Sequence, residues 1–177
     1  MRSSRARWVL PAGLLAVPAF HAAYATQYMS VAEAQRAAFA DASEFRALPA
    51  LDAGVAAALG AQGWSPQIWQ VQGASGALGW FFVDQVIGKS ELITYAVALD
   101  AAGAVKSIEV LDYRESHGSE IRLAAWRKQF VGKTAADPIV AGRDVDIISG
   151  ATYSSKAMAL GVKRDTLVLQ AALKNGL

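Results

Sequence analysis

Residues 78–113 read LGWFFVDQVIGKSELITYAVALDAAGAVKSIEVLDY, and this stretch decides the fold. It contains three runs, residues 78–87, 91–99 and 104–113, that are rich in Val, Ile, Phe, Trp and Tyr, the residue types that favour β-strands. Residues 100–103 read DAAG, which predicts a hairpin connection between the second and third runs. The stretch therefore predicts consecutive antiparallel strands of one sheet.

The segments on either side of these strands have helical patterns. Ser30 and Glu33 have the spacing of a capping box, and an alanine-rich run continues from them to Asp41. Residues 51–62 predict a second helix, and the chain from Thr152 to the C-terminus predicts a third. Because the strands are consecutive and the helices lie at both ends, we expect an α+β fold in which an antiparallel sheet packs against N-terminal and C-terminal helices.

Shorter segments complete the expected fold. Residues 67–72 alternate like a strand, and the glycine-containing residues 73–76 predict a turn after it. Residues 119–130 have helical character. A polar loop follows them, and residues 144–148 are expected to be a short extended stretch before the last helix.

The composition excludes several kinds of chemistry. The chain has 177 residues, of which 54% are hydrophobic and 18% charged, which is typical of a folded domain rather than a disordered one. It contains no cysteine, so thiolate metal sites, iron–sulfur clusters, c-type haem attachment and cysteine nucleophiles are excluded. Redox chemistry would therefore need an organic cofactor.

The N-terminal residues have the pattern of an export signal. Arg2, Arg5 and Arg7 precede an apolar run at residues 8–20, and an Ala-Tyr-Ala cleavage sequence ends at Ala25. The run is shorter than the roughly 20 residues that a membrane-spanning helix needs. We therefore expect cleavage of residues 1–25 and a periplasmic location; the alternative is an uncleaved anchor in the inner membrane that faces the periplasm.

Removal of that signal also changes the net charge. The whole chain has 17 basic and 15 acidic residues, and the loss of three arginines leaves 14 basic against 15 acidic residues, a net charge of −1. No stripe of basic residues remains in the mature chain. We therefore expect no nucleic-acid partner.

Two glycine-containing segments resemble nucleotide-binding motifs only in part. Gly73, Gly76 and Gly79 lie between two predicted strands, whereas a dinucleotide fingerprint joins a strand to a helix. Residues 88–90, Gly-Lys-Ser, resemble the end of a phosphate-binding P-loop, but Val83 occupies the position of its first glycine and a strand follows. Neither segment predicts a nucleotide site of these classes.

The histidine content limits the kinds of metal site and catalytic site that the chain can form. His21 lies in the predicted signal, which leaves His117 as the single histidine of the mature chain. A zinc site built on several histidines is therefore excluded, and we expect no metal site. A Ser-His-Asp hydrolase would have to use His117, and we assign no catalytic residue.

Residues 144–155, DVDIISGATYSS, are the most informative segment. An extended stretch enters a tight turn and then a helix, whose first N–H groups suit a phosphate. Gly150 would let a ligand approach the backbone closely, and Ala151 adds no bulk. Four hydroxyl side chains are near this turn: Ser149, Thr152, Ser154 and Ser155. The alternative is an ordinary helix start with Ser149 as its N-cap.

Within this segment, Asp146, Ser149, Gly150, Ala151 and Thr152 form the pattern Asp-x-x-Ser-Gly-Ala-Thr. It resembles the flavinylation motif of the FMN-binding domain family, which includes the periplasmic flavoprotein subunits of sodium-pumping quinone reductase and of Rnf-type complexes. The resemblance implies FMN bound covalently through a phosphoester to Thr152. It implies a flavin transferase that uses FAD and releases AMP. We assign Asp146 to loop shape or to recognition by that transferase.

The resemblance extends on both sides of the acceptor motif. Residues 95–113 resemble the strand-turn-strand of the family, and residues 126–133 resemble its W-x-x-Q-F-x-G-K segment. Residues 115–120 occupy the place of the Glu-Thr-Pro-Gly-Leu-Gly loop that approaches the flavin in larger relatives, with His117 where that pattern has proline. The implied cofactor-binding residues beyond the motif are Glu115, His117, Gly118, Tyr153, Ser154 and Ser155.

These observations predict an exported electron-transfer flavoprotein. It would pass electrons between a membrane-bound redox protein and an extracytoplasmic acceptor. The alternatives are a flavin-dependent reductase of a small extracytoplasmic substrate and a non-redox module that binds flavin or phosphate, so the enzyme class stays open. We expect residues 26–80 to form a helical lead-in with the first strands and residues 81–177 to form the FMN-binding domain, as one compact unit.

Overall fold

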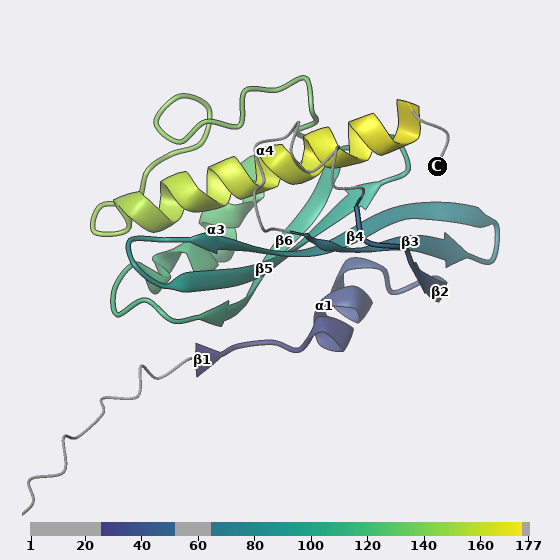
Figure 1. The fold of residues 1–177 in the computed structure, drawn as a ribbon, viewed down its shortest axis with the longest axis horizontal. Coiled ribbons are helices and arrows are strands. Elements are labelled where there is room, and N and C mark those ends of the chain that lie inside the picture. Colours follow the sequence, from purple (N-terminus) through teal and green to yellow (C-terminus); the bar gives the residue numbers. More distant parts are fainter. Residues whose placement is uncertain (1–25, 52–64, 175–177) are drawn as a thin grey trace, which may run out of the picture.

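The sheet has six antiparallel strands in the order β1-β6-β5-β4-β3-β2. The computed structural model describes residues 26–51 and 65–174 (Figure 1). The strands are Thr26–Gln27 (β1), Ala42–Ala47 (β2), Gln67–Gly73 (β3), Gly76–Ile87 (β4), Leu92–Asp100 (β5) and Val105–Tyr113 (β6). The helices are Val31–Ala38 (α1), Ala124–Arg127 (α3) and Thr152–Lys174 (α4), with 3-10 turns at Ser119–Arg122 (η1) and Lys128–Phe130 (η2).

Helices cover both faces of this sheet. Figure 1 shows α4 lying across one face and α1 against the other. Phe82 belongs to the larger core cluster, which includes Met158 and Val162 of α4, whereas the neighbouring Phe81 packs with Ala34 and other residues of the α1 side. Successive side chains of a strand point to opposite faces, so β4 supplies both cores. The α+β fold with an antiparallel sheet is confirmed.

Most of the expected elements are present with small shifts of their ends. The strands β3 to β6, the hairpin after β5 and the helix from Thr152 are confirmed. Ser30 and Glu33 form both halves of the capping box. The helix that follows ends at Ala38 rather than Asp41, because the chain turns at Phe39 to bury that side chain. The helix expected at residues 51–62 lies outside the described residues except for Leu51, which is not helical.

Four segments differ in some respect from the sequence-based expectation. The two outer strands β1 and β2 were not predicted, because β1 has only two residues, both polar, β2 has no clear strand pattern, and their conformation depends on pairing with β6 and β3. Residues 144–148 form no strand; Val145 makes only an isolated bridge with Ala141. Residues 119–130 are helical but divided into three short pieces.

A buried polar network fixes α4 on the sheet. The Tyr95 hydroxyl lies 2.9 Å from a carboxyl oxygen of Asp84 and 2.9 Å from one of Asp165. Arg164 binds the same Asp84 oxygen at 2.6 Å. A Cβ at Gly161 would overlap the Tyr95 hydroxyl, so this glycine allows the helix to approach β5.

The number of hydrogen atoms that this network can donate indicates which carboxyl group is protonated. A tyrosine hydroxyl has one hydrogen to donate, so it cannot donate to both carboxyl groups. Asp84 has a guanidinium partner, and the remaining carboxyl, Asp165, is fully buried. Burial and the nearby Asp84 carboxylate raise the pKa of Asp165 well above its usual range. Burial and the neighbouring charge therefore favour the protonated form of Asp165, beside a Tyr95 hydroxyl that can donate to only one of the two carboxyl groups.

This assignment predicts a specific dependence of stability on pH. Folded Asp165 keeps its proton to higher pH than in the unfolded chain. Its contribution to the free energy of unfolding therefore falls as the pH rises above about 4, the ordinary aspartate pKa. Asp165→Asn keeps a neutral donor. Denaturant unfolding should show the variant gaining on the wild type with rising pH, by at most about 1.4 kcal/mol per pH unit.

The exposed Asp41 provides the matched control. Asp41→Asn should leave the pH dependence of unfolding unchanged. A constant difference between Asp165→Asn and the wild type from pH 5 to pH 9 would show that Asp165 is ionised throughout.

Candidate functional site

Three segments that are distant in the sequence surround one cavity. Its volume is about 420 Å³, and it is formed by the turn between β4 and β5, the loop after β6 and the first turn of α4. The structure thus brings the 115–118 loop and the Thr152 turn together. The lining residues are Lys89, Ser90, Glu115, Ser116, His117, Gly150, Ala151, Thr152, Tyr153 and Ser154.

Tyr113 joins the loop after β6 to the start of α4. Its hydroxyl donates to the carbonyl oxygen of His117 and lies 2.8 Å from the Ser154 hydroxyl. Because the single tyrosine hydrogen is used on His117, Ser154 must be the donor to Tyr113. A Cβ at Gly118 would lie 2.7 Å from the Tyr113 hydroxyl and 2.9 Å from the Ser154 hydroxyl, and the φ angle there is +91°. Glycine is therefore required where the loop meets the helix.

Glu115 holds the turn between β4 and β5. One of its carboxylate oxygens accepts hydrogen bonds from the N–H groups of Ser90 at 2.6 Å and Glu91 at 2.9 Å. Partial burial favours the protonated form, but these donors outweigh it and hold the pKa of Glu115 below its usual value. A Cβ at Gly88 would lie 2.7 Å from the same oxygen, so a side chain there would displace the carboxylate. Glu115 therefore has a positioning role within the protein, in addition to lining the cavity.

The acceptor motif forms a turn directly before α4. The Ala151 N–H donates to the Ile148 carbonyl at 3.0 Å, and Gly150 has a φ of +84°, which favours glycine. A Cβ at Gly150 would meet no atom within 4 Å, so open space lies beside the turn. Ala151 is buried, and its methyl group packs in the core. Ser149 lies three residues before the helix and is not its N-cap.

The four hydroxyl side chains of this segment have different surroundings. Ser154 and Ser155 are buried; Ser154 is bonded to Tyr113, and the Ser155 hydroxyl accepts the Ile148 N–H at 3.3 Å. Ser149 is exposed but does not line the cavity, whereas Thr152 is exposed and lines it. Thr152 is thus the solvent-exposed motif hydroxyl at the cavity wall, and the exposed Tyr153 ring is beside it.

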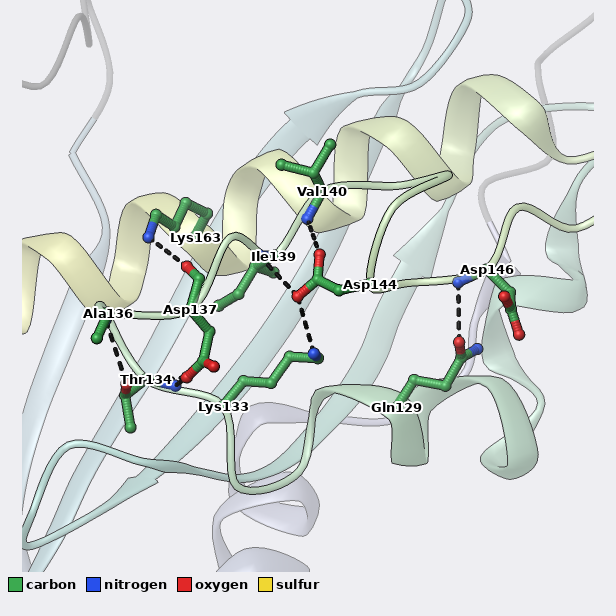
Figure 2. A network of polar contacts seen from close by, with 10 residues as sticks. All are labelled: Gln129, Lys133, Thr134, Ala136, Asp137, Ile139, Val140, Asp144, Asp146 and Lys163. Atoms are coloured by element: carbon green, nitrogen blue, oxygen red, sulfur yellow. Dashed lines mark hydrogen bonds and ion pairs between the residues drawn. The ribbon is translucent and has the colours of Figure 1, made fainter.

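Asp146 lies outside the cavity. Its N–H donates to the Gln129 side chain at 2.8 Å, and its carbonyl accepts from the Trp126 indole at 2.7 Å. Asp146 is exposed, and Figure 2 shows its side chain beside the Gln129 amide, with the dashed hydrogen bond made by the Asp146 N–H. The backbone of Asp146 is therefore clamped while its side chain is exposed to solvent, an arrangement that suits a role in loop shape or in recognition by another protein.

A second aspartate organises the loop that leads to the motif. The Asp144 carboxylate accepts from Lys133 at 2.8 Å, from the Val140 N–H at 2.7 Å and from the Ile139 N–H at 3.1 Å (Figure 2). Its slight burial opposes ionisation, but these donors lower the pKa of Asp144 to about 2. Ile139 has a φ of +49°, which is unfavourable for a β-branched residue. The carboxylate holds this strained backbone in place.

The same loop is tied to α4 by Lys163. Its ammonium group donates to the carbonyl oxygens of Ala135 at 2.7 Å and Asp137 at 2.5 Å. The Asp137 carboxylate in turn accepts from the N–H and the hydroxyl of Thr134 (Figure 2). The segment from Val131 to Ala151 contains no helix or strand, so these side-chain contacts hold it in place of regular backbone hydrogen bonds.

Four residues contribute to the site without any indication in the sequence pattern: Lys89, Ser90, Ser116 and Tyr113. The Gly-Lys-Ser segment at residues 88–90 was correctly excluded as a P-loop, since it is the turn of a β-hairpin. Its proximity to Thr152 depends on the tertiary fold. In the sequence, the one indication that this turn belongs to the site is that it directly precedes β5, the strand in which the family resemblance begins.

A larger cavity of about 660 Å³ lies between β4, β5 and α4. Its wall includes Ile87, Leu160 and Arg164, but none of the motif residues. We therefore assign the site to the smaller cavity, where the motif lies. The described residues contain no group of three or more histidine, aspartate or glutamate side chains placed to hold a metal ion. Among these residues no helix has the length and apolar character to cross a membrane.

Residues 88–165 match the family model of the FMN-binding domain. The match begins at Gly88 in the turn between β4 and β5 and ends at Asp165 in α4, so it includes every residue that lines the smaller cavity. No curated protein matches this chain. Residues 88–165 are thus similar to the FMN-binding domain family, the family that the sequence motif resembles.

Proposed function

We propose that this protein is an exported electron-transfer flavoprotein that carries FMN as a phosphoester on Thr152. The observation that supports it best is the position of the Thr152 hydroxyl. It is exposed at the first residue of α4 and lines a cavity built by the segments that resemble the flavin site of the family. The FMN-binding match covers this whole region.

The residues at the cavity fit a phosphorylated flavin. Its volume of about 420 Å³ falls within the roughly 300–1,000 Å³ of small-molecule and cofactor sites. The first N–H groups of α4 have no carbonyl partner inside the helix, and the positive end of the helix dipole favours a phosphate. The open space beside Gly150 leaves room for a ligand next to Thr152.

Attachment would require a flavin transferase and FAD. The oxygen of the Thr152 hydroxyl forms a bond to the phosphorus of the FMN half of FAD. The bond between that phosphorus and the bridging oxygen breaks, AMP leaves with this oxygen, and the hydroxyl proton passes to a base of the transferase or to water. The protein contributes an exposed acceptor on a rigid turn, with the exposed Asp146 carboxylate as a recognition feature for the transferase.

The chain's own residues would hold and shield the flavin. Flavin exchanges electrons singly or in pairs, which suits a carrier between a membrane-bound redox protein and an extracytoplasmic acceptor. Glu115, Ser116 and His117 form one wall, and the turn at Gly150 and Ala151 forms the other, while the buried Gly118 packs behind the wall against Tyr113 and Ser154. A covalent link would also keep the cofactor from diffusing away after export.

The first prediction concerns the acceptor. Co-expression with a flavin transferase, followed by denaturation and mass analysis, should show one FMN on Thr152. Thr152→Val, which keeps the side-chain shape but lacks the hydroxyl, should abolish attachment, whereas Thr152→Ser should retain it. Turnover assays with small acceptors would identify a reductase instead of a carrier.

The buried hydroxyl of Ser155 provides the control for this experiment. Ser155→Ala should keep full attachment if the variant folds, which its thermal unfolding would establish. An unmodified wild-type protein, under conditions that modify a known flavoprotein acceptor, would contradict the proposal.

The second prediction concerns export. Cleavage after Ala25 would make Thr26 the first residue and preserve its pairing with Tyr113 in the sheet. The mature protein in the periplasmic fraction should therefore begin at Thr26, as N-terminal sequencing can show. Recovery of a membrane-bound form that still begins at Met1 would support the uncleaved anchor.

The third prediction concerns the loop before the motif. Because the pKa of Asp144 is lowered to about 2, its contribution to loop stability is present above about pH 4 and is lost as the pH falls from there to about 2. Asp144→Asn should expose the amides of Ile139 and Val140 to faster hydrogen exchange at neutral pH and should slow attachment to Thr152.

Arg143 is the neighbouring exposed residue, and Arg143→Gln should change neither exchange nor attachment. Unchanged protection of both amides in Asp144→Asn would contradict the role of this carboxylate.

A further inference from the structure

The turn between β4 and β5 brings a cation to the cavity that holds Thr152. Lys89 is the only lysine or arginine among the described residues that line this cavity. Its side chain is exposed and makes no ion pair with any described residue. Lys89 is therefore available to an anion in the cavity.

The fold holds this lysine in place through its neighbours. The turn is closed by a hydrogen bond of 3.0 Å from the Gly88 N–H to the Glu91 carbonyl. Glu115 binds the N–H groups of Ser90 and Glu91, and its second oxygen lies 3.4 Å from the Ser90 hydroxyl. The one carboxylate of the cavity wall is thus directed at the backbone of the turn, and it fixes the turn on which Lys89 stands.

The opposite wall also favours an anion. The first turn of α4 presents N–H groups without intrahelical partners, and the Thr152 hydroxyl lies at the same end. A positively charged side chain and a helix N-terminus thus face one cavity from two different elements. A phosphate linked to Thr152, or the pyrophosphate that precedes it, would lie between them.

We infer that Lys89 binds the phosphate of the flavin nucleotide and positions it against Thr152. This inference rests on the proposed function. Lys89 would make the site prefer phosphorylated flavin over riboflavin, which has the same ring but no phosphate. Lys89 is a positioning residue, and the bond-forming atom remains the Thr152 hydroxyl oxygen.

The binding experiment uses the mature protein with Thr152→Val, which cannot be modified. Free FMN and riboflavin are titrated while the flavin fluorescence is recorded. Adding Lys89→Gln should weaken FMN binding by about three- to tenfold, the range for one partly solvated charged hydrogen bond. Riboflavin binding should not change. Lys89→Arg should restore FMN binding, and the difference should shrink at high salt.

A second measurement follows attachment in proteins that retain Thr152. Lys89→Gln should slow transfer from FAD, and Lys89→Glu should slow it further, while Lys128→Gln, an exposed lysine on η2, should not. Thermal unfolding of each variant checks the fold. This measurement decides the question where free flavin binds too weakly to titrate.

The outcomes separate the two proposals. If the wild type is not modified at all, the proposed function fails, and with it the role of Lys89 in attachment. If the wild type is modified and Lys89→Gln is modified at the same rate, Lys89 has no role while the proposed function stands. An equal loss of FMN and riboflavin binding would overturn phosphate recognition and show that Lys89 only shapes the cavity.

Discussion

The hydroxyl of Tyr113 is the contact on which the site depends. It lies at the end of β6, donates to the His117 carbonyl and accepts from Ser154 in the first turn of α4. One buried polar atom thus joins the sheet, the loop and the helix, and Gly118 is needed because the three approach so closely. Without this junction the loop and the Thr152 turn would have no fixed relation. The cavity between them forms because Tyr113, at the end of β6, holds the loop and the helix together.

Glu115 has a role in the structure that the sequence does not indicate. The resemblance to larger relatives suggested a loop acid close to the flavin, and the residue does line the cavity. Its carboxylate, however, is bonded to backbone N–H groups across 24 and 25 residues of sequence. An acid that accepts two backbone hydrogen bonds is held in its ionised form and rigidifies the turn it binds. Any effect on a bound flavin would come from a charge whose place is fixed by that turn.

The two motifs of the resembling region also contact each other. Trp126 and Gln129, from one motif, bind the carbonyl and the N–H of Asp146, which begins the other. Lys133, from the same segment, donates to the side-chain carboxylate of Asp144 at 2.8 Å. The long segment before Thr152 belongs to no strand or helix that would supply regular backbone hydrogen bonds. Side chains from the first motif supply hydrogen bonds to it instead. The acceptor turn is rigid because a distant helical segment clamps it, which explains in physical terms why both patterns are present in one chain.

The sequence by itself determined the strands from β3 to β6, the capping box at Ser30 and the helix from Thr152, because periodicity, turn residues and caps are properties of contiguous residues. It also singled out residues 144–155 and the loop after β6, which the structure brings to one cavity. Tertiary structure alone decided that Lys89 and Thr152 line one cavity, that Tyr113 joins loop to helix, and that β1 and β2 complete the sheet. Each of these depends on partners far apart in the chain, such as Tyr113 and Ser154, which are 41 positions apart, and no local pattern encodes which distant groups will meet.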